Sequence, residues 1–420
     1  METAIRNFFQ DKNKISKLVS NILMIPLLAP LVMLLVGNKL QFVFYILMFV
    51  PGILGLFIGL FYIESNKISL KKIISDKKNL PIIFLVLFLL VTFISCLFAK
   101  DKTLAFIGDR YRREGFITYL GYAGYFILGM FNKKNSKQAN ILILVSIVLG
   151  TVALISYVQD STLAITSSFF NANHYGYYLV ITTILSLILF MNGTNYQSKI
   201  FYLISYVLNL VVLIYNNTFG SFLGVLAGLI IALVYYLKKS KKLIIIPWIV
   251  IILLSLLCQK SGENIVWNNF RILNSDAKHA ISNLKLQNLT YEDKQIGSFR
   301  GELWHTTPKF IAEKPLIGYG LDNSVSEYSR YNSYVSDRPH NIFLYITASS
   351  GFIGAMLYFT GYFMILLKPF IKIIKNKKIT KEEEILFFII GAFFVSSLFG
   401  NTMFYTSPYI ILFLGMLFRK

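Results

Sequence analysis

Arginine and histidine are unevenly distributed along this chain. Seven of the nine arginines and all four histidines lie in the polar segments 99–115, 159–174 and 259–340, whereas the other polar segments use lysine almost exclusively. A guanidinium group binds phosphate through two parallel hydrogen bonds, while lysine offers a point charge. A neutral imidazole can accept a proton near neutral pH. The distribution predicts a site for a phosphorylated ligand beside a proton acceptor, with salt bridges within these segments as the alternative.

The first candidate patch is GDRYRREGF, residues 108–116, which stands directly before an apolar run. Its three arginines, Arg110, Arg112 and Arg113, are candidate phosphate ligands. A belt of basic side chains that reach to the membrane surface is the alternative interpretation.

The second patch is SSFFNANHYGYY, residues 167–178, which is rich in aromatic and amide side chains. Aromatic faces stack on sugar rings and amides bond sugar hydroxyls, so Asn173 and His174 are candidate substrate contacts. An interfacial aromatic belt, with Asn173 capping the following helix, explains the same residues equally well.

The third patch, residues 298–323, contains Arg300 and Trp304. Helical spacing predicts a short helix with an apolar inner face and a kink or break at Pro308. Pro315 and the two glycines that follow it predict a tight turn. A purely structural helix and turn is the alternative to a site. The predicted inner face consists of Leu303, Trp304, Thr307, Phe310 and Ile311.

The fourth patch, DRPHNIFLYITASSGFIG, residues 337–354, places Arg338, Pro339 and His340 directly before a long apolar run. A helix that starts there would favour an anion at its N-terminus. Since His340 lies beside Arg338, we expect it to have a functional role, although histidines at the ends of membrane spans are usually interfacial residues.

Motifs for metal binding are absent from the sequence. It contains no Asp-x-Asp or Glu-x-Asp pair and no close group of histidines and cysteines. We therefore expect no metal and no cofactor. Cys96 and Cys258 both fall in apolar runs, which predicts packing roles and no disulfide.

Composition identifies the elements that must position these residues. Of 420 residues, 55% are hydrophobic and only 15% are charged, and the mean hydropathy is +0.61. These values exclude a cytosolic enzyme and a secreted disulfide scaffold, and they predict an all-α polytopic membrane protein. We expect one membrane domain, 1–420, with about twelve spans, or ten or eleven if the shortest runs do not cross. The apolar runs are 19–36, 41–63, 80–98, 116–131, 140–158, 175–191, 199–215, 219–237, 243–258, 341–367, 385–400 and 403–418.

Basic residues predict the orientation. If the N-terminus is cytoplasmic, the cytoplasmic segments hold 25 lysines and arginines and the short outer loops hold six. Positive residues favour the cytoplasmic side. We therefore place both termini in the cytoplasm and the long loop 259–340, with its short helices, outside. The formal net charge of +21 is then a topology signal beside anionic lipid, and nucleic acid is not an expected partner.

Taken together, the patches resemble the O-antigen ligase and polymerase family of bacterial envelope enzymes. RREGFITYL resembles its arginine-rich entry to a span, and FFNANHYGYYL its Asn-x-Asn-His segment. FRGELWHTTPKFIAEKPLIGYGLDN is similar to the stretch of the family's large loop that ends in Pro-Leu-x-Gly-x-Gly. RPHNIFLYITASSGFIG is similar to its His-Asn-x-x-Leu segment. In one departure, Phe219 occupies the arginine position of a Ser-Arg-Gly motif that many members carry.

The resemblance implies a GT-C-like fold and a metal-independent, inverting glycosyl transfer at the outer leaflet of the bacterial cytoplasmic membrane. The implied donor is a glycan on undecaprenyl diphosphate, and the implied acceptor is a hydroxyl of another glycan or glycolipid. His340 would be the general base. The implied substrate contacts are Arg110, Arg112, Arg113, Asn173, His174, Arg300, Trp304 and Arg338.

Two other functions fit a membrane protein of this composition. One is a flippase or transporter for lipid-linked glycans, and the other is a structural subunit of envelope assembly. Transporters usually need ionisable groups within their spans, and under the predicted topology none lies well within a span. The concentration of Arg and His in the outer segments therefore favours the enzyme.

Overall fold

The structure is a computed structural model that describes residues 2–37, 40–133, 136–162, 164–283, 291–331, 333 and 336–419. Nearly all of its regular elements are helices, as the composition predicts. In chain order the longer elements are α1 (Glu2–Gln10), α2 (Lys12–Ile22), α3 (Met24–Val36), α4 (Gln41–Ser65), α5 (Leu70–Ser75), α6 (Leu80–Leu97), α7 (Lys102–Ile107), α8 (Phe116–Phe131), α9 (Ser136–Gln159), α10 (Ala172–Asn192), α11 (Tyr196–Asn216), α12 (Phe219–Lys238), α13 (Ile245–Leu257), β1 (Gln259–Lys260), β2 (Glu263–Asn264), α14 (Ile265–Asn283), α15 (Tyr291–Glu313), α16 (Val325–Arg330), α17 (Ile342–Ile374), α18 (Lys381–Ser397) and α19 (Ser407–Phe418).

Every predicted apolar run is helical in the structure, but the runs differ in length. Within the described residues, eight helical segments are long and apolar enough to cross a membrane. The runs near 116–131, 243–258 and 403–418 form shorter apolar helices, and α18 has only 17 residues. A span needs about 20 residues. The chain is therefore a multi-pass membrane protein, and the number twelve stays a prediction.

Helix α10 lies at the centre of the bundle. Within its most apolar stretch, 94% of the residues are buried inside the protein, and α11, α12 and α18 pack around it. Small residues permit the close approach: a Cβ added to Gly224 of α12 would lie 2.0 Å from the Ser396 hydroxyl of α18. Close packing through small residues is a common way for membrane helices to associate.

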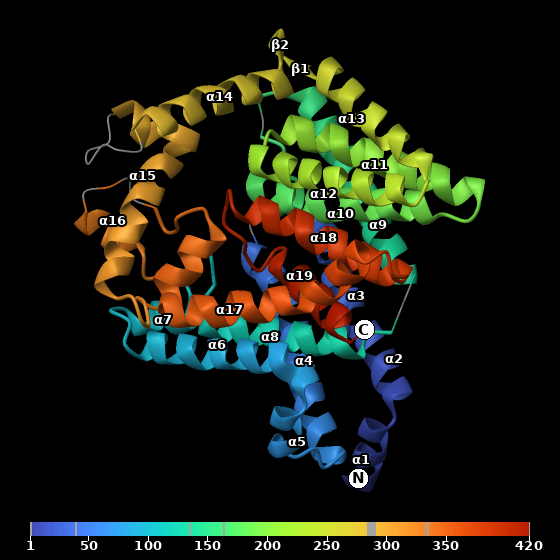
Figure 1. The fold of residues 1–420 in the computed structure, drawn as a ribbon, viewed down its shortest axis with the longest axis vertical. Coiled ribbons are helices and arrows are strands. Elements are labelled where there is room, and N and C mark those ends of the chain that lie inside the picture. The colour runs from blue at the N-terminus through green and yellow to red at the C-terminus, as the bar shows by residue number, and fades with distance from the viewer. Residues whose placement is uncertain are drawn as a thin grey trace.

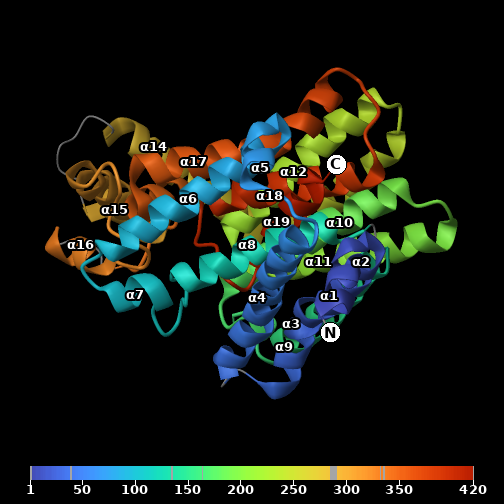
Figure 2. The same ribbon diagram turned by 90° about the horizontal axis from the view of Figure 1, so that it is seen from below.

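The segment between α13 and α17 gathers at one end of the bundle (Figures 1 and 2). It begins with the antiparallel β1–β2 hairpin, in which Gln259 pairs with Asn264. Helices α14, α15 and α16 follow and form an arch from α13 back to α17 (left in Figure 1). The predicted loop 259–340 is thus largely helical where the structure describes it.

The third sequence patch forms the helical part of α15. Leu303, Phe310 and Ile311 are buried in one cluster and Trp304 packs against it, while Thr307 on the same helix is also buried, as the spacing predicts. The predicted break at Pro308 is wrong, because the non-helical residues lie earlier, at Ile296–Phe299. Pro308 sits on the exposed face, where the helix accommodates the proline ring.

A break in α17 anchors the turn that follows α15. Gly351 has φ +68° and ψ −179°, a conformation that only glycine adopts readily. The break lets Phe352 N–H donate to the Pro315 carbonyl at 2.7 Å and frees the Ala348 carbonyl to accept from Tyr319 N–H at 2.9 Å. The chain after Pro315 is therefore fixed against the start of α17, next to the fourth patch.

Candidate functional site

Four segments that are distant in sequence meet at the end of the bundle that carries the arch. They are the loop before α8, the start of α10, the residues before α17 and the α18–α19 turn, 398–406. The predicted topology puts all four on one side of the membrane. The turn is the common partner, because its side chains and carbonyls bind residues from the other segments.

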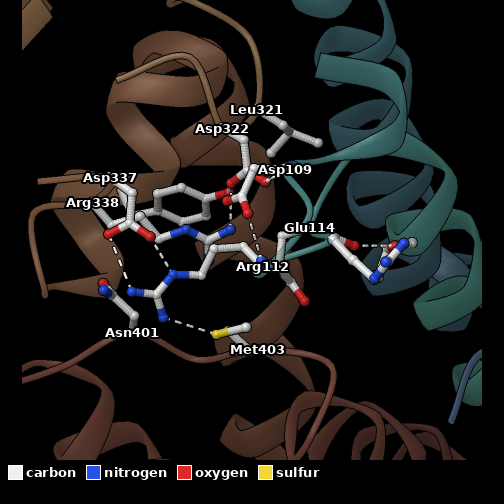
Figure 3. Close-up of polar contacts among 12 residues, drawn as sticks. Asp109, Arg112, Glu114, Leu321, Asp322, Asp337, Arg338, Asn401 and Met403 are labelled. Atoms are coloured by element: carbon white, nitrogen blue, oxygen red, sulfur yellow. Dashed lines mark hydrogen bonds and ion pairs between the residues drawn. The ribbon is translucent and has the colours of Figure 1, made fainter. Parts of the chain in front are cut away.

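Arg112 and Asp337 join the loop before α8 to the residues before α17. Two guanidinium nitrogens of Arg112 donate to the two carboxylate oxygens of Asp337, the Nη2–Oδ1 contact being 3.2 Å (Figure 3). The Arg112 Nη1 atom also contacts Met403 Sδ at 3.0 Å. Burial favours the neutral form of Asp337, but the Arg112 charge outweighs it and lowers the pKa of this carboxyl. Both side chains keep some solvent exposure, 13% and 29%.

Arg338 and Asp322 form a second pair in the interior of the site. Arg338 is only 1% exposed, and its Nη2 atom donates to Asp322 Oδ1 at 2.5 Å (Figure 3). Its Nη1 atom donates to the Thr402 carbonyl at 3.3 Å, and the guanidinium lies 4.2 Å from the Tyr345 ring centre. Asp322 also accepts from Asp109 N–H at 3.3 Å. This arginine therefore connects three segments and is not open to a ligand.

His340 has a fixed backbone and a free imidazole. Its N–H donates to Asn401 Oδ1 at 3.1 Å, and Trp304 Nε1 donates to the Pro339 carbonyl at 2.8 Å. The residue adopts φ +53°. Among the described residues its ring nitrogens have no hydrogen-bond partner. Burial, followed by the positive charges of Arg300 and Arg112, lowers the pKa of His340 to about 4, so the imidazole is neutral at physiological pH.

Arg300 faces the same space without a carboxylate partner in the described chain. Its Nε atom donates to the Phe399 carbonyl at 3.0 Å and its Nη1 atom to the Gly297 carbonyl at 2.5 Å. Burial lowers its pKa. A half-buried guanidinium that binds only carbonyls carries an uncompensated positive charge, which favours an anionic ligand.

The second patch contributes one buried residue and one correction. His174 is 1% exposed, stacks on Tyr405 at 4.9 Å, and has no hydrogen bond to either ring nitrogen within the described structure. It lies in the charge field of Arg112 and Arg338. The predicted cap at Asn173 is wrong: the side chain of Asn171 caps α10 and accepts from Asn173 N–H at 2.8 Å.

The other two arginines of the first patch lie apart from His340. Arg113 stacks on the rings of Phe42 and Tyr45, at 4.7 and 5.5 Å, and its Nε atom is buried without a partner among the described residues. Arg110 is exposed. Of the three arginines, only Arg112 is thus brought to the histidine.

Glu114 marks the inner edge of the site. It is 2% exposed and accepts a hydrogen bond from the Tyr122 hydroxyl. Burial raises its pKa to about 7, although Arg338 favours the charged form. Glu114 and Thr402 line one end of a crevice of about 170 Å³ between α6, α8, α17 and α19, whose other walls are mostly apolar. An apolar path thus leads from the charged site into the membrane region.

The roles of several site residues are not identifiable from sequence patterns. Glu114, Asp322 and Asp337 lie inside the sequence patches, but no local pattern indicates their partners, and Asn401 lies outside every patch. Only Asn401 and Thr402 separate the last two apolar runs, so briefly that they predict only a connection. No three His, Cys, Asp or Glu side chains of the described ranges lie close enough to hold a metal ion.

Comparison with known proteins gives consistent matches. A family model described as O-antigen ligase matches residues 204–359, which include Arg300, Arg338 and His340. A provisionally named polysaccharide ligase of Rickettsia typhi is 26% identical over 317 residues, 70% of this chain and 69% of that protein. Its counterpart in Rickettsia prowazekii is 24% identical over 311 residues, 69% of this chain and 67% of the relative. These matches support a relationship between this chain and the O-antigen ligase family.

Proposed function

We propose that this membrane enzyme transfers a glycan from an undecaprenyl-diphosphate-linked donor to a hydroxyl of a glycan or glycolipid, outside the cytoplasmic membrane. The observation that carries the proposal is the free, neutral imidazole of His340 beside the uncompensated guanidinium of Arg300. A proton acceptor next to an anion site is what this transfer requires. The proposed reaction inverts the sugar anomeric centre and uses no metal.

In the proposed step His340 acts as the general base. The acceptor oxygen attacks the anomeric carbon of the donor sugar, and its proton passes to the imidazole. The bond between that carbon and the diphosphate oxygen breaks, and undecaprenyl diphosphate leaves with the electron pair. Fixed guanidinium groups stabilise the charge that develops on this oxygen without having to reorganise.

The arginines then divide into direct contacts and positioning residues. Arg300 lacks a carboxylate partner, so we assign it to the diphosphate. Arg112 is shared with Asp337 and can contact the diphosphate only from its exposed edge. Arg338 is enclosed by Asp322 and Tyr345 and acts by holding the backbone before His340. Trp304 has the same role through the Pro339 carbonyl.

Donor binding would also activate the base. The charges of Arg300 and Arg112 contribute to the low pKa of His340, and a bound diphosphate would neutralise them. The pKa of the imidazole would then rise towards neutrality, where a general base is most effective. The base would thus gain strength only when a donor is present.

The apolar crevice that starts at Glu114 would hold the part of the undecaprenyl chain nearest the diphosphate. Its side chains from α6, α8 and α17 are lipid-like, and the crevice ends beside the arginines. The same lining argues against the flippase alternative, because a glycan crossing the membrane would need polar groups along its path.

The test is glycan transfer in vitro from a purified carrier-linked donor. We expect His340→Ala to lose about 10²- to 10⁴-fold in rate while the protein still inserts and binds donor. His305→Ala is the control, since His305 lies on α15 and makes no contact with His340. Near-normal turnover of the His340→Ala protein would disprove the base assignment.

A further inference from the structure

A second cavity lies at the end of the bundle opposite the arginines. It occupies about 410 Å³ between α3, α9, α10, α11, α18 and α19. Helices α8, α10 and α19 each begin near His340 and end near this cavity, which fixes its place at the other membrane surface. Its walls are mostly apolar, including Leu142, Leu189 and Phe413, whereas its polar lining includes amides, Lys381 and Glu382.

Asn132, on the rim, has an unsatisfied acceptor. The residue is 1% exposed, and its Nδ2 atom donates to Gln138 Oε1 at 2.8 Å. Its Oδ1 atom is buried and has no partner within the described chain. A buried acceptor without a donor is costly, so a ligand that supplies a hydroxyl or ammonium group there would be stabilised.

The same rim carries excess positive charge. Lys381 donates to the Asn192 carbonyl at 3.2 Å. Burial lowers the pKa of Lys241; the nearby charges of Lys239, Lys381 and Lys199 lower it further, although Glu384 favours its charged form. Lys239, Lys381 and Lys199 therefore lie close enough to Lys241 to repel it.

The carboxylates at this end of the bundle have other partners. Glu382 pairs with Arg419 at 3.0 Å and Glu383 with Lys372 at 2.5 Å. Glu384 accepts from the Tyr235 hydroxyl at 3.0 Å and lies near Lys241. It offsets one of the four lysine charges, and the remaining positive charge favours an additional anion.

We propose that this cavity binds one anionic phospholipid of the adjacent leaflet, with an acyl chain among the leucines, the phosphate at Lys381 and a head-group hydroxyl donated to Asn132. Basic pockets between membrane helices are known to bind anionic lipid head groups. Hydrocarbon that fills an apolar space also restores the dispersion contacts that an empty one lacks. In the proposed orientation the leaflet is cytoplasmic. The site is independent of the transfer reaction.

The test is native mass spectrometry of the delipidated protein titrated with phosphatidylglycerol or phosphatidylcholine. We expect one phosphatidylglycerol molecule to bind more tightly than phosphatidylcholine. Lys381→Gln should weaken it about fivefold, the value expected for one lysine near a lipid phosphate. Ala139→Phe places a ring in the cavity and should abolish binding. Lys377→Gln, an exposed lysine outside the cavity, is the matched control.

Three results would overturn the proposal. Equal affinity for the two lipids would show that the cavity does not recognise an anionic head group. Undiminished phosphatidylglycerol binding by folded Ala139→Phe protein would show that the lipid binds outside this cavity. If Ala139→Phe does not fold, the two lysine variants decide, and equal affinities of Lys381→Gln and Lys377→Gln would refute the site.

Discussion

At the scale of single residues, the structure separates arginines that the sequence could only group. The uneven use of Arg and His predicted an outer site for a phosphorylated ligand. It did not predict that Arg338 would be enclosed by Asp322, or that Arg113 would stack on Phe42. Those partners lie more than ten residues away in sequence, and only tertiary packing brings them close. No local pattern contains that information.

The first prediction concerns the pH dependence of transfer. Protonated His340 cannot act as a base, so kcat/KM should fall as the pH drops through the pKa of the free enzyme, about 4. The bound diphosphate should raise this pKa, so the acid limb of kcat should lie at a higher pH. Rates measured between pH 4 and 8 with saturating and limiting donor provide the comparison. Coincident acid limbs would show that the donor does not act on His340.

Arg300→Lys tests the diphosphate contact with the charge preserved. Lysine loses one of the two charge-assisted hydrogen bonds, so kcat/KM should fall about tenfold to a hundredfold. Arg330→Lys is the control, because Arg330 pairs with Glu313 on the surface of the arch. Steady-state kinetics with purified donor give the answer, and equal activity of the two variants would assign Arg300 a structural role.

At the scale of elements, periodicity and apolar runs predicted the helices. The position of a break or a cap depends instead on tertiary contacts. The inner face of α15 followed from its spacing, and all apolar runs became helices. The break in α17 was not predicted, because Gly351 stands in the apolar run 341–367 like any other helical glycine. Its role depends on the Pro315 turn, which lies 36 residues earlier. The cap of α10 moved from Asn173 to Asn171 for a similar reason, since either amide could begin the helix.

Gly351→Ala should destabilise the protein. A Cβ at this position would lie 2.2 Å from the backbone of Leu316, and the glycine-specific backbone conformation, with φ +68° and ψ −179°, adds about 1–3 kcal/mol. We expect a lower midpoint of thermal unfolding and reduced transfer. Gly391→Ala in α18 is the matched control, because its Cβ would meet no atom within 4 Å. A Gly351→Ala protein as stable as the control would contradict the role of the break.

At the scale of the whole molecule, the two ends of the bundle differ in their residues. The arch and the arginines gather at one end, and the lysine-rich rim and second cavity lie at the other. The basic-residue count predicted this division into two sides, and the structure brings the predicted outer segments together. The convergence on the α18–α19 turn could not be predicted from the sequence, because the two residues between the last two apolar runs carry no recognisable pattern.

The orientation is tested by cysteine labelling. Ser261→Cys lies in the β1–β2 hairpin and Ser240→Cys in the turn after α12; both serines are exposed, with φ of 53° and 56°, which makes them a matched pair. The native cysteines are buried. An impermeant thiol reagent should label Ser261→Cys in cells with a permeable outer envelope and Ser240→Cys only after the cytoplasmic membrane is opened. The reverse labelling pattern would show that the protein has the opposite orientation in the membrane.

The most direct test of glycan transfer uses the purified protein in proteoliposomes with undecaprenyl-diphosphate-linked glycan and acceptor supplied on the side of the arch. Mass spectrometry would follow the glycan and the carrier separately. We predict an enlarged acceptor glycan with inverted linkage, one undecaprenyl diphosphate released for each transfer, and neither product with the His340→Ala protein. Donor that crosses the membrane intact, with no carrier released, would contradict the enzyme and identify a transporter.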